Sequence, residues 1–172
     1  MDITTLWLNE QCPVTNGIYY ADGEVTEMHI DETINSVVVG QQTTLNKILT
    51  KAPKYLSDIC IFAEVDFVSD SASYTAHAGD GSYGSDGFVC LTQNSAVLWI
   101  AFFDSNEFMV MKYKNHHLHA VNNCRSEWGF QIDAPEKISI INTHVDSKNN
   151  LSQEGFTLGG MMKSKQRMTL CS

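Results

Sequence analysis

Two histidines in the C-terminal half of the chain have the spacing of metal ligands. His117 and His119 are two residues apart in HHLHAV, so on a strand both side chains would project from one face and could hold a metal ion from two points. A third ligand would have to be His144, His77 or His29, and no pattern such as H-E-x-x-H brings one near. We predict a surface pair on an edge strand and no bound metal. A small metal-dependent enzyme built on His117 and His119 stays open as an alternative.

A glycine-rich stretch offers a second possible chemistry. Residues 79–84 read GDGSYG and match G-x-G-x-x-G, a pattern that binds a dinucleotide when a helix begins at the loop. Here the strand-like run FVCLT follows, and nearby aspartates would repel phosphate. Counted from Asp80 as the start of an EF-hand, the fifth and twelfth positions are Gly84 and Leu91, where calcium ligands are needed. We predict no cofactor at this stretch.

Two carboxylates could work together in the first half of the chain. Glu64 and Asp66 alternate with apolar residues in ICIFAEVDFV, so they share one face of a predicted strand, as paired carboxylates of a hydrolase would need to do. The same spacing is also typical of the solvent-exposed face of a half-buried strand. No G-x-S-x-G motif supplies a nucleophile, and we predict no catalytic residue.

Strand patterns dominate the elements that must position these groups. Alternating or continuous apolar runs predict strands at 59–68, 88–92, 96–103 and 108–113. The segment 96–103 is apolar on both faces, which is typical of a central strand, and DSNE at 104–107 reads as a hairpin. Weaker strand patterns lie at 3–8, 23–30, 36–39, 117–121, 129–132 and 137–141.

One helix pattern stands out, at 43–55. Leu45, Ile48 and Leu49 form an apolar stripe, and Pro53 should end the helix or kink its last turn. The short connections favour antiparallel pairing. We therefore predict an α+β fold in a single domain, 1–172: a twisted, mainly antiparallel sheet of about six to eight strands with one main helix packed on it.

Two segments lack a clear strand or helix pattern. Residues 69–87, SDSASYTAHAGDGSYGSDG, contain acids, glycines and serines but no Lys or Arg, and we predict a long acidic surface loop, which at this length is functional or disordered. Within it, Tyr74 and Tyr83 could serve as aromatic anchors for a partner. Residues 143–172 are expected to be a loose tail or a final edge strand.

Charge is distributed unevenly along the chain. The net charge is −9, and residues 1–111 hold 15 acids and 3 bases whereas residues 112–172 hold 5 acids and 8 bases. Such a field attracts basic surfaces and repels nucleic acid, although net charge also serves solubility alone. The chain has no signal-peptide pattern and no apolar run long enough to cross a membrane, so we expect a cytoplasmic protein that binds neither nucleic acid nor a membrane.

This overall character resembles the immunity proteins of contact-dependent growth inhibition and other polymorphic-toxin systems. The resemblance rests on a compact, acidic, strand-rich chain without a catalytic motif. It implies a protein that binds a cognate basic toxin domain, often a nuclease, and blocks its active or substrate-binding surface. A structural subunit that docks a basic partner permanently is the other alternative. The residues expected to form the contact surface are Glu64, Asp66, Asp70, Tyr74, Asp80, Tyr83 and Asp86.

Overall fold

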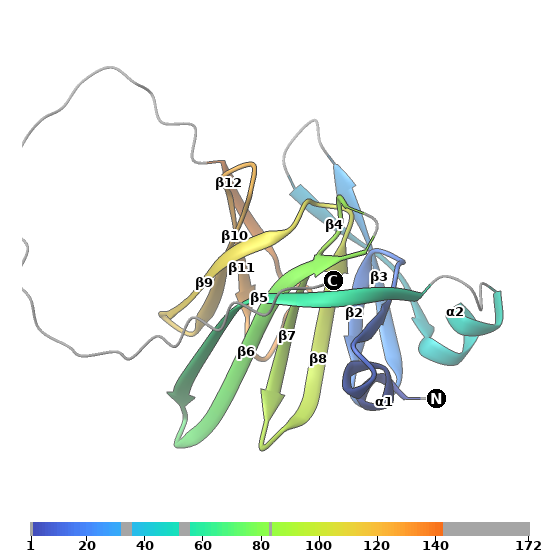
Figure 1. The fold of residues 1–172 in the computed structure, drawn as a ribbon, viewed down its shortest axis with the longest axis horizontal. Helices are drawn as coiled ribbons and strands as arrows, with labels where there is room; N and C mark the ends of the chain where they lie inside the picture. The colour runs from blue at the N-terminus through green and yellow to red at the C-terminus, as the bar shows by residue number, and fades with distance from the viewer. Residues whose placement is uncertain (1, 32–35, 52–55, 83, 143–172) are drawn as a thin grey trace, which may run out of the picture.

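Antiparallel β-sheet accounts for most of the protein in the computed structural model, which describes residues 2–31, 36–51, 56–82 and 84–142. Figure 1 shows the arrangement of its elements. In chain order they are α1 (Ile3–Leu8), β1 (Gln11–Pro13), β2 (Gly17–Tyr20), β3 (Glu24–Asp31), β4 (Ser36–Thr44), α2 (Leu45–Lys51), β5 (Leu56–Ser69), β6 (Ala72–Gly81), β7 (Gly87–Gln93), β8 (Ala96–Phe103), β9 (Phe108–Lys114), β10 (His117–Asn122), β11 (Ser126–Gln131) and β12 (Ser139–Asn142).

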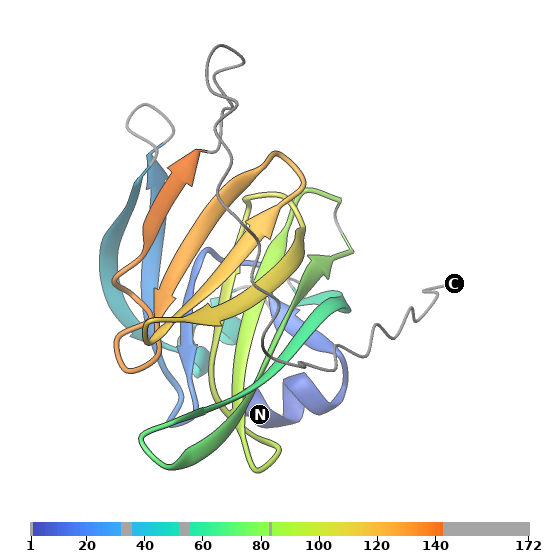
Figure 2. The ribbon, with the colours of Figure 1, turned by 90° about the vertical axis from the view of Figure 1, so that its left-hand side faces the viewer.

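The strands form two sheets that pack face to face (Figure 2). The larger sheet has eight strands in the order β1-β5-β6-β7-β8-β2-β3-β4, and the smaller has four in the order β12-β11-β10-β9. The connection 104–107 leads from the larger sheet into the smaller one, so it is not the predicted hairpin. The prediction of a mainly antiparallel sheet is confirmed, but the described strands number twelve in two sheets rather than six to eight in one.

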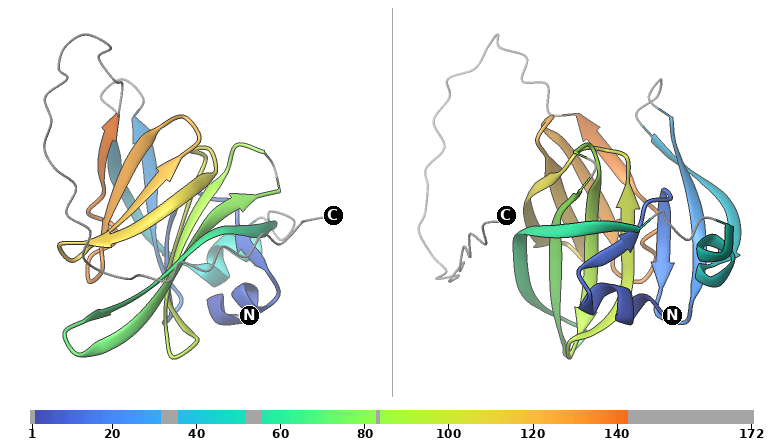
Figure 3. Two further views of the ribbon diagram at one scale, coloured as in Figure 1. Left: turned by 60° about the vertical axis from the view of Figure 1, so that its left-hand side comes forward. Right: turned by 45° about the vertical axis from the view of Figure 1, so that its right-hand side comes forward.

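The central strand β8 explains why both faces of the larger sheet are covered. Trp99, Ala101 and Phe103 point into the core between the two sheets, whereas Ile100 and Phe102 belong to a second core on the opposite face. Two helices cover that opposite face (Figure 3). A strand that is apolar on both sides is stable only when it is buried on both sides, so the predicted central position of 96–103 is confirmed.

Both helices are short, and the described residues do not confirm one main helix. Residues 3–8 form a helix rather than the predicted strand because Asp2 caps it, accepting a hydrogen bond of 2.7 Å from the Thr5 N–H. Ile3 and Leu6, three residues apart, then face the core with no exposed surface. The helix predicted at 43–55 begins only at Leu45, because Thr43 and Thr44 continue β4; its predicted end lies outside the described residues.

The predicted loop at 69–87 is wrong, because most of it is the inner strand β6. This strand pairs with β5 on one side and β7 on the other. Asp70 and Ser71, with φ of 49° and 66°, make the two-residue turn into it. The strand pattern was missed because the buried residues of β6 are small. Ala76 and Ala78 are fully buried, and a Cβ on Gly79 would lie 1.8 Å from the Cys60 carbonyl oxygen. None of the described helices is long and apolar enough to cross a membrane.

Candidate functional site

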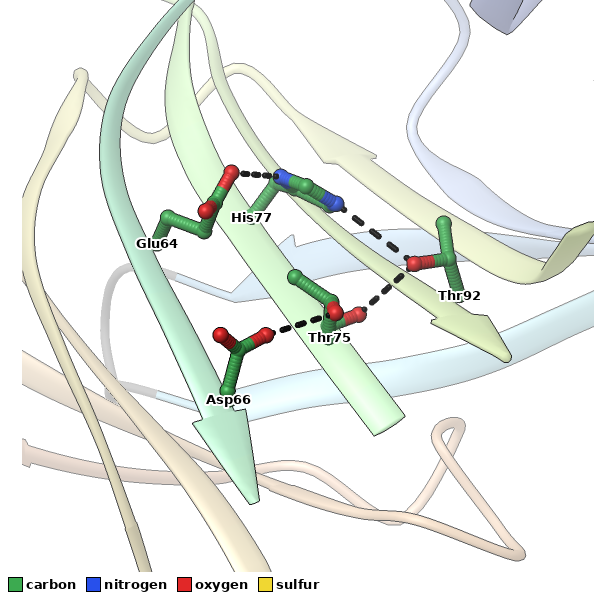
Figure 4. A network of polar contacts seen from close by, with 5 residues as sticks. All are labelled: Glu64, Asp66, Thr75, His77 and Thr92. Atoms are coloured by element: carbon green, nitrogen blue, oxygen red, sulfur yellow. Dashed lines mark hydrogen bonds and ion pairs between the residues drawn. The ribbon is translucent and has the colours of Figure 1, made fainter. Parts of the chain in front are cut away.

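A network of polar side chains lies on three neighbouring strands, on the face of the larger sheet that also carries α1. The register places Glu64 beside His77 and Asp66 beside Thr75 on β5 and β6. On the next strand, Thr92 of β7 lies opposite Thr75. Figure 4 shows these five side chains and the contacts that join them. The predicted common face of Glu64 and Asp66 is therefore confirmed, and it forms one side of this network.

His77 is the most enclosed titratable group of the network. Its Nδ1 lies 3.1 Å from Glu64 Oε2, without the geometry of a hydrogen bond, and its side chain is 13% exposed whereas that of Glu64 is 55% exposed. The ring of Trp7 on α1 covers it, with centroids 5.1 Å apart. Burial lowers the pKa of His77, and the charge of Glu64 opposes that shift without reversing it. His77 is therefore a neutral imidazole at pH 7.

The chain order Glu64, His77, Thr92 places a carboxylate, an imidazole and a hydroxyl in line, as in a nucleophilic triad. The hydroxyl is not available for chemistry. Thr92 is only 4% exposed. Its Oγ1 donates a hydrogen bond to the Thr75 carbonyl oxygen at 3.0 Å and lies 3.5 Å from His77 Nε2. Because a nucleophile must reach its substrate, these three residues do not form a working acyl-transfer triad.

An open cleft of about 380 Å³ adjoins the network. The pairing of β6 with β7 begins only at Thr75 and Thr92, and the cleft lies beyond it, toward the turns of the two hairpins. Asp66, Thr75 and Asn94 supply polar groups to its lining, and Val68 supplies an apolar side chain. Asp66 Oδ1 accepts a hydrogen bond of 2.7 Å from Thr75 Oγ1, which fixes the carboxylate at the cleft. A cationic side chain is the group that such a lining would bind best.

The other predicted contact residues are not all gathered around Glu64 and Asp66. Asp70 lies in the turn before β6, and Asp80 lies near the far end of that strand. Ten residues of extended strand span roughly 33 Å, so these acids belong to opposite ends of the sheet. Tyr74 is half-buried: its ring stacks on Phe67 at 5.4 Å and packs against the core between the sheets, and it also lines the cleft beside Asp66. Tyr83 lies outside the described residues.

A second group of acids lies at the β6–β7 and β8–β9 connections. Burial, then the charge of Glu107, raises the pKa of Asp80. Burial, then the charges of Asp104 and Asp80, raises the pKa of Asp86. Asp86 is only 8% exposed, and its Oδ2 has no hydrogen-bond partner among the described residues. Like charges therefore crowd together here, at a cost in stability.

The histidine pair lies in the other sheet. His117 and His119 do share a face, with ring centroids 6.1 Å apart, but β10 pairs with strands on both sides and is not an edge strand as predicted. His119 Nδ1 lies 2.8 Å from Glu127 Oε1, and Lys112 Nζ lies 3.2 Å from the other oxygen. Although burial acts to raise it, Lys112 and His119 together lower the pKa of Glu127. No three His, Cys, Asp or Glu side chains in the described part of the chain are grouped to hold a metal ion.

Sequence reasoning missed His77, Thr75, Thr92 and Trp7 as parts of the network. The signal was present in TAHAG at 75–79, where Thr75 and His77 alternate with two buried alanines. That pattern has the period of a strand. No protein-family model, curated protein or solved structure matches this chain, so the two-sheet fold and the network are the basis for assigning a function.

Proposed function

We propose that this chain is a cytosolic immunity protein that binds a cognate basic toxin domain and blocks its active or substrate-binding surface. The observation that carries the proposal is the acidic β5–β6 hairpin, residues 56–81, which has five acids and no Lys or Arg. Asp58 and Asp80 lie near one end of this hairpin and Asp70 lies in the turn at the other end, so the proposed contact centres on Glu64 and Asp66 between them. Glu64 and Asp66 are exposed on its outer face, beside the cleft.

Charge explains how such a surface would select its partner. A nuclease domain must be basic to hold the phosphates of its substrate. Opposite charge on the inhibitor accelerates association and disfavours wrong partners. The cleft beside Asp66 could accept a lysine or arginine side chain, because carboxylate–guanidinium pairs are among the stronger polar contacts.

The polar network supports binding in preference to catalysis. Its hydroxyl is buried and already donates a hydrogen bond, so the network offers no accessible nucleophile. Its role is to hold Asp66 in place through the hydrogen bond from Thr75, whereas Glu64 lies beside His77 without a hydrogen bond. Fixed side chains lose less conformational entropy when a partner binds.

The test uses the full chain and, as the cognate toxin, the domain that this proposal expects to be encoded by the gene directly before its own. Glu64→Lys combined with Asp66→Lys should weaken binding by about a hundredfold, measured by calorimetry, and abolish rescue of cells that express the toxin. Asp22→Lys combined with Glu24→Lys is the matched control: it changes the charge equally at two exposed positions near the β2–β3 turn. Equal effects of the two pairs would reject the β5–β6 hairpin as the contact surface. Absence of any binding by the unaltered chain would reject the proposal itself.

A further inference from the structure

The open edges of the two sheets differ in how they are protected. An unpaired edge invites pairing with another chain, and proteins blunt it with short strands, proline, charge, bulges or covering elements. β1 has three residues and ends at Pro13, and β12 has four. β9 carries Lys112 and Lys114. β5 extends beyond its pairing with β1, but there it has a bulge, Glu64 and Asp66.

The remaining edge strand, β4, is contacted by β12 of the smaller sheet but has few of the other protections. Within the described ranges, β4 pairs only with β3, and its sequence, SVVVGQQTT, has no charge and no proline. Its one irregularity is a bulge where Gly40 and Gln41 stand opposite Glu27. Before that bulge, residues 36–39 form a regular edge with Val38 48% and Val39 52% exposed.

We propose that two copies of this chain associate through antiparallel pairing of their β4 edges. The unsatisfied backbone groups require an extended strand as occupant. A second copy is the occupant that is present whenever the protein is, so it can cover the edge before any other partner is met. The pairing would join two eight-stranded sheets into one continuous sheet across a two-fold axis.

The sequence of β4 fits itself in one register. Directly opposite residues of antiparallel strands share a face, so the register must keep Val37 and Val39 on one face and Val38 on the other. With the axis at Val38, this residue faces the partner subunit's Val38, and Val37 faces the partner subunit's Val39. Ser36 then faces the partner subunit's Gly40, where the bulge ends the regular stretch. Cross-strand pairs of β-branched residues are favourable in sheets.

Charge does not prevent this association, although each copy carries a net charge of −9. No ionisable group lies on β4 itself. The nearest acids on the adjoining strand, Glu27 and Asp31 of β3, would be separated from those of the second copy by three strand spacings, about 14 Å. That distance exceeds the Debye length of about 8 Å at physiological ionic strength, so their repulsion is screened.

The test is sedimentation velocity of the full chain over a range of concentrations. The unaltered chain should show a reversible monomer–dimer equilibrium. Val38→Lys should weaken dimerisation by about tenfold or more, because two lysines would face each other at the axis. Val38→Glu should do the same, and a mixture of the two variants should recover the dimer because opposite charges would then meet.

Val110→Lys is the matched control, since Val110 is 57% exposed on β9 in the other sheet; it should dimerise like the unaltered chain. Circular dichroism confirms that each variant is folded before it is compared. A chain that stays monomeric at all concentrations overturns the proposal. So does a dimer that Val38→Lys leaves unchanged, and so does a mixture that recovers no dimer, because the proposed register puts the two side chains in contact.

Discussion

The imidazole of His77 lies 3.1 Å from the carboxylate of Glu64, yet its pKa is lowered rather than raised. A carboxylate at this distance favours the charged imidazole, whereas burial disfavours it. The ring of Trp7 covers His77, and the Glu64 side chain remains 55% exposed to solvent that screens its charge. Burial therefore prevails, and His77 is held neutral between the sheet and α1.

Acid should destabilise the protein through His77. Its folded-state pKa lies below the ordinary 6.5, so the unfolded chain binds more protons, and this contribution to stability is present above pH 6.5 and is lost as pH falls through the folded pKa. The free energy of unfolding in urea should thus fall between about pH 7.5 and 5.5, and less steeply in His77→Gln. His29→Gln, at an exposed position, should keep the original slope. Equal slopes for His77→Gln and the unaltered chain would contradict the assignment.

Asp86 should give the opposite pH dependence of stability. Its pKa is raised by burial and by the charges of Asp104 and Asp80, so its charged form penalises folding as pH rises through the folded pKa, and the penalty is absent below 3.8. Asp86→Asn should therefore stabilise the protein at pH 7 by about 1 kcal/mol, with the gain shrinking toward pH 3. Asp133→Asn, at an exposed position, should change stability little. A loss of stability in Asp86→Asn at pH 7 would mean that the charge has a favourable partner.

The strands that could be predicted from the sequence are those whose apolar pattern is local. Residues 96–103 correspond to β8 with the same bounds, and 59–68 lies within β5. The strand β6 was not predicted because alanines, not large apolar residues, occupy its core face. Its neighbours leave no room for larger side chains, as at Gly79. Six residues at 3–8 were too few to distinguish a helix from a strand.

The candidate site could be predicted only in part because it depends on non-local pairing. The spacing of Glu64 and Asp66 showed that they share a face. The neighbours of these acids, His77 and Thr75, are set by the register of β5 with β6, which shifts at a bulge between Ile61 and Ala63. A shift by one residue would turn His77 to the other face. Division into two sheets is likewise set by which strands pair, not by any one segment.

Gly79 tests the close packing of β6 against β5. A Cβ at this position would lie 1.8 Å from the Cys60 carbonyl oxygen and 2.9 Å from the Phe88 ring. Gly79→Ala should therefore lower the free energy of unfolding by about 3 kcal/mol or more, because the clash is with backbone and cannot be relieved by a rotamer change. Ser73→Ala, on the same strand but exposed, should cost little. Similar stability of the two variants in urea denaturation would contradict the packing.

Two buried tryptophans allow the contribution of one hydrogen bond to stability to be measured. Trp99 and Trp128 are 3% and 4% exposed, and both stack on Phe130. Trp99 Nε1 donates to the Ile132 carbonyl oxygen at 3.0 Å, whereas Trp128 Nε1 has no acceptor among the described residues. Replacement by phenylalanine removes similar volume at both sites, but only at Trp99 does it leave a buried carbonyl, that of Ile132, without its donor. Trp99→Phe should therefore cost about 1–3 kcal/mol more than Trp128→Phe in urea denaturation, and equal losses would show that the Ile132 carbonyl finds another donor.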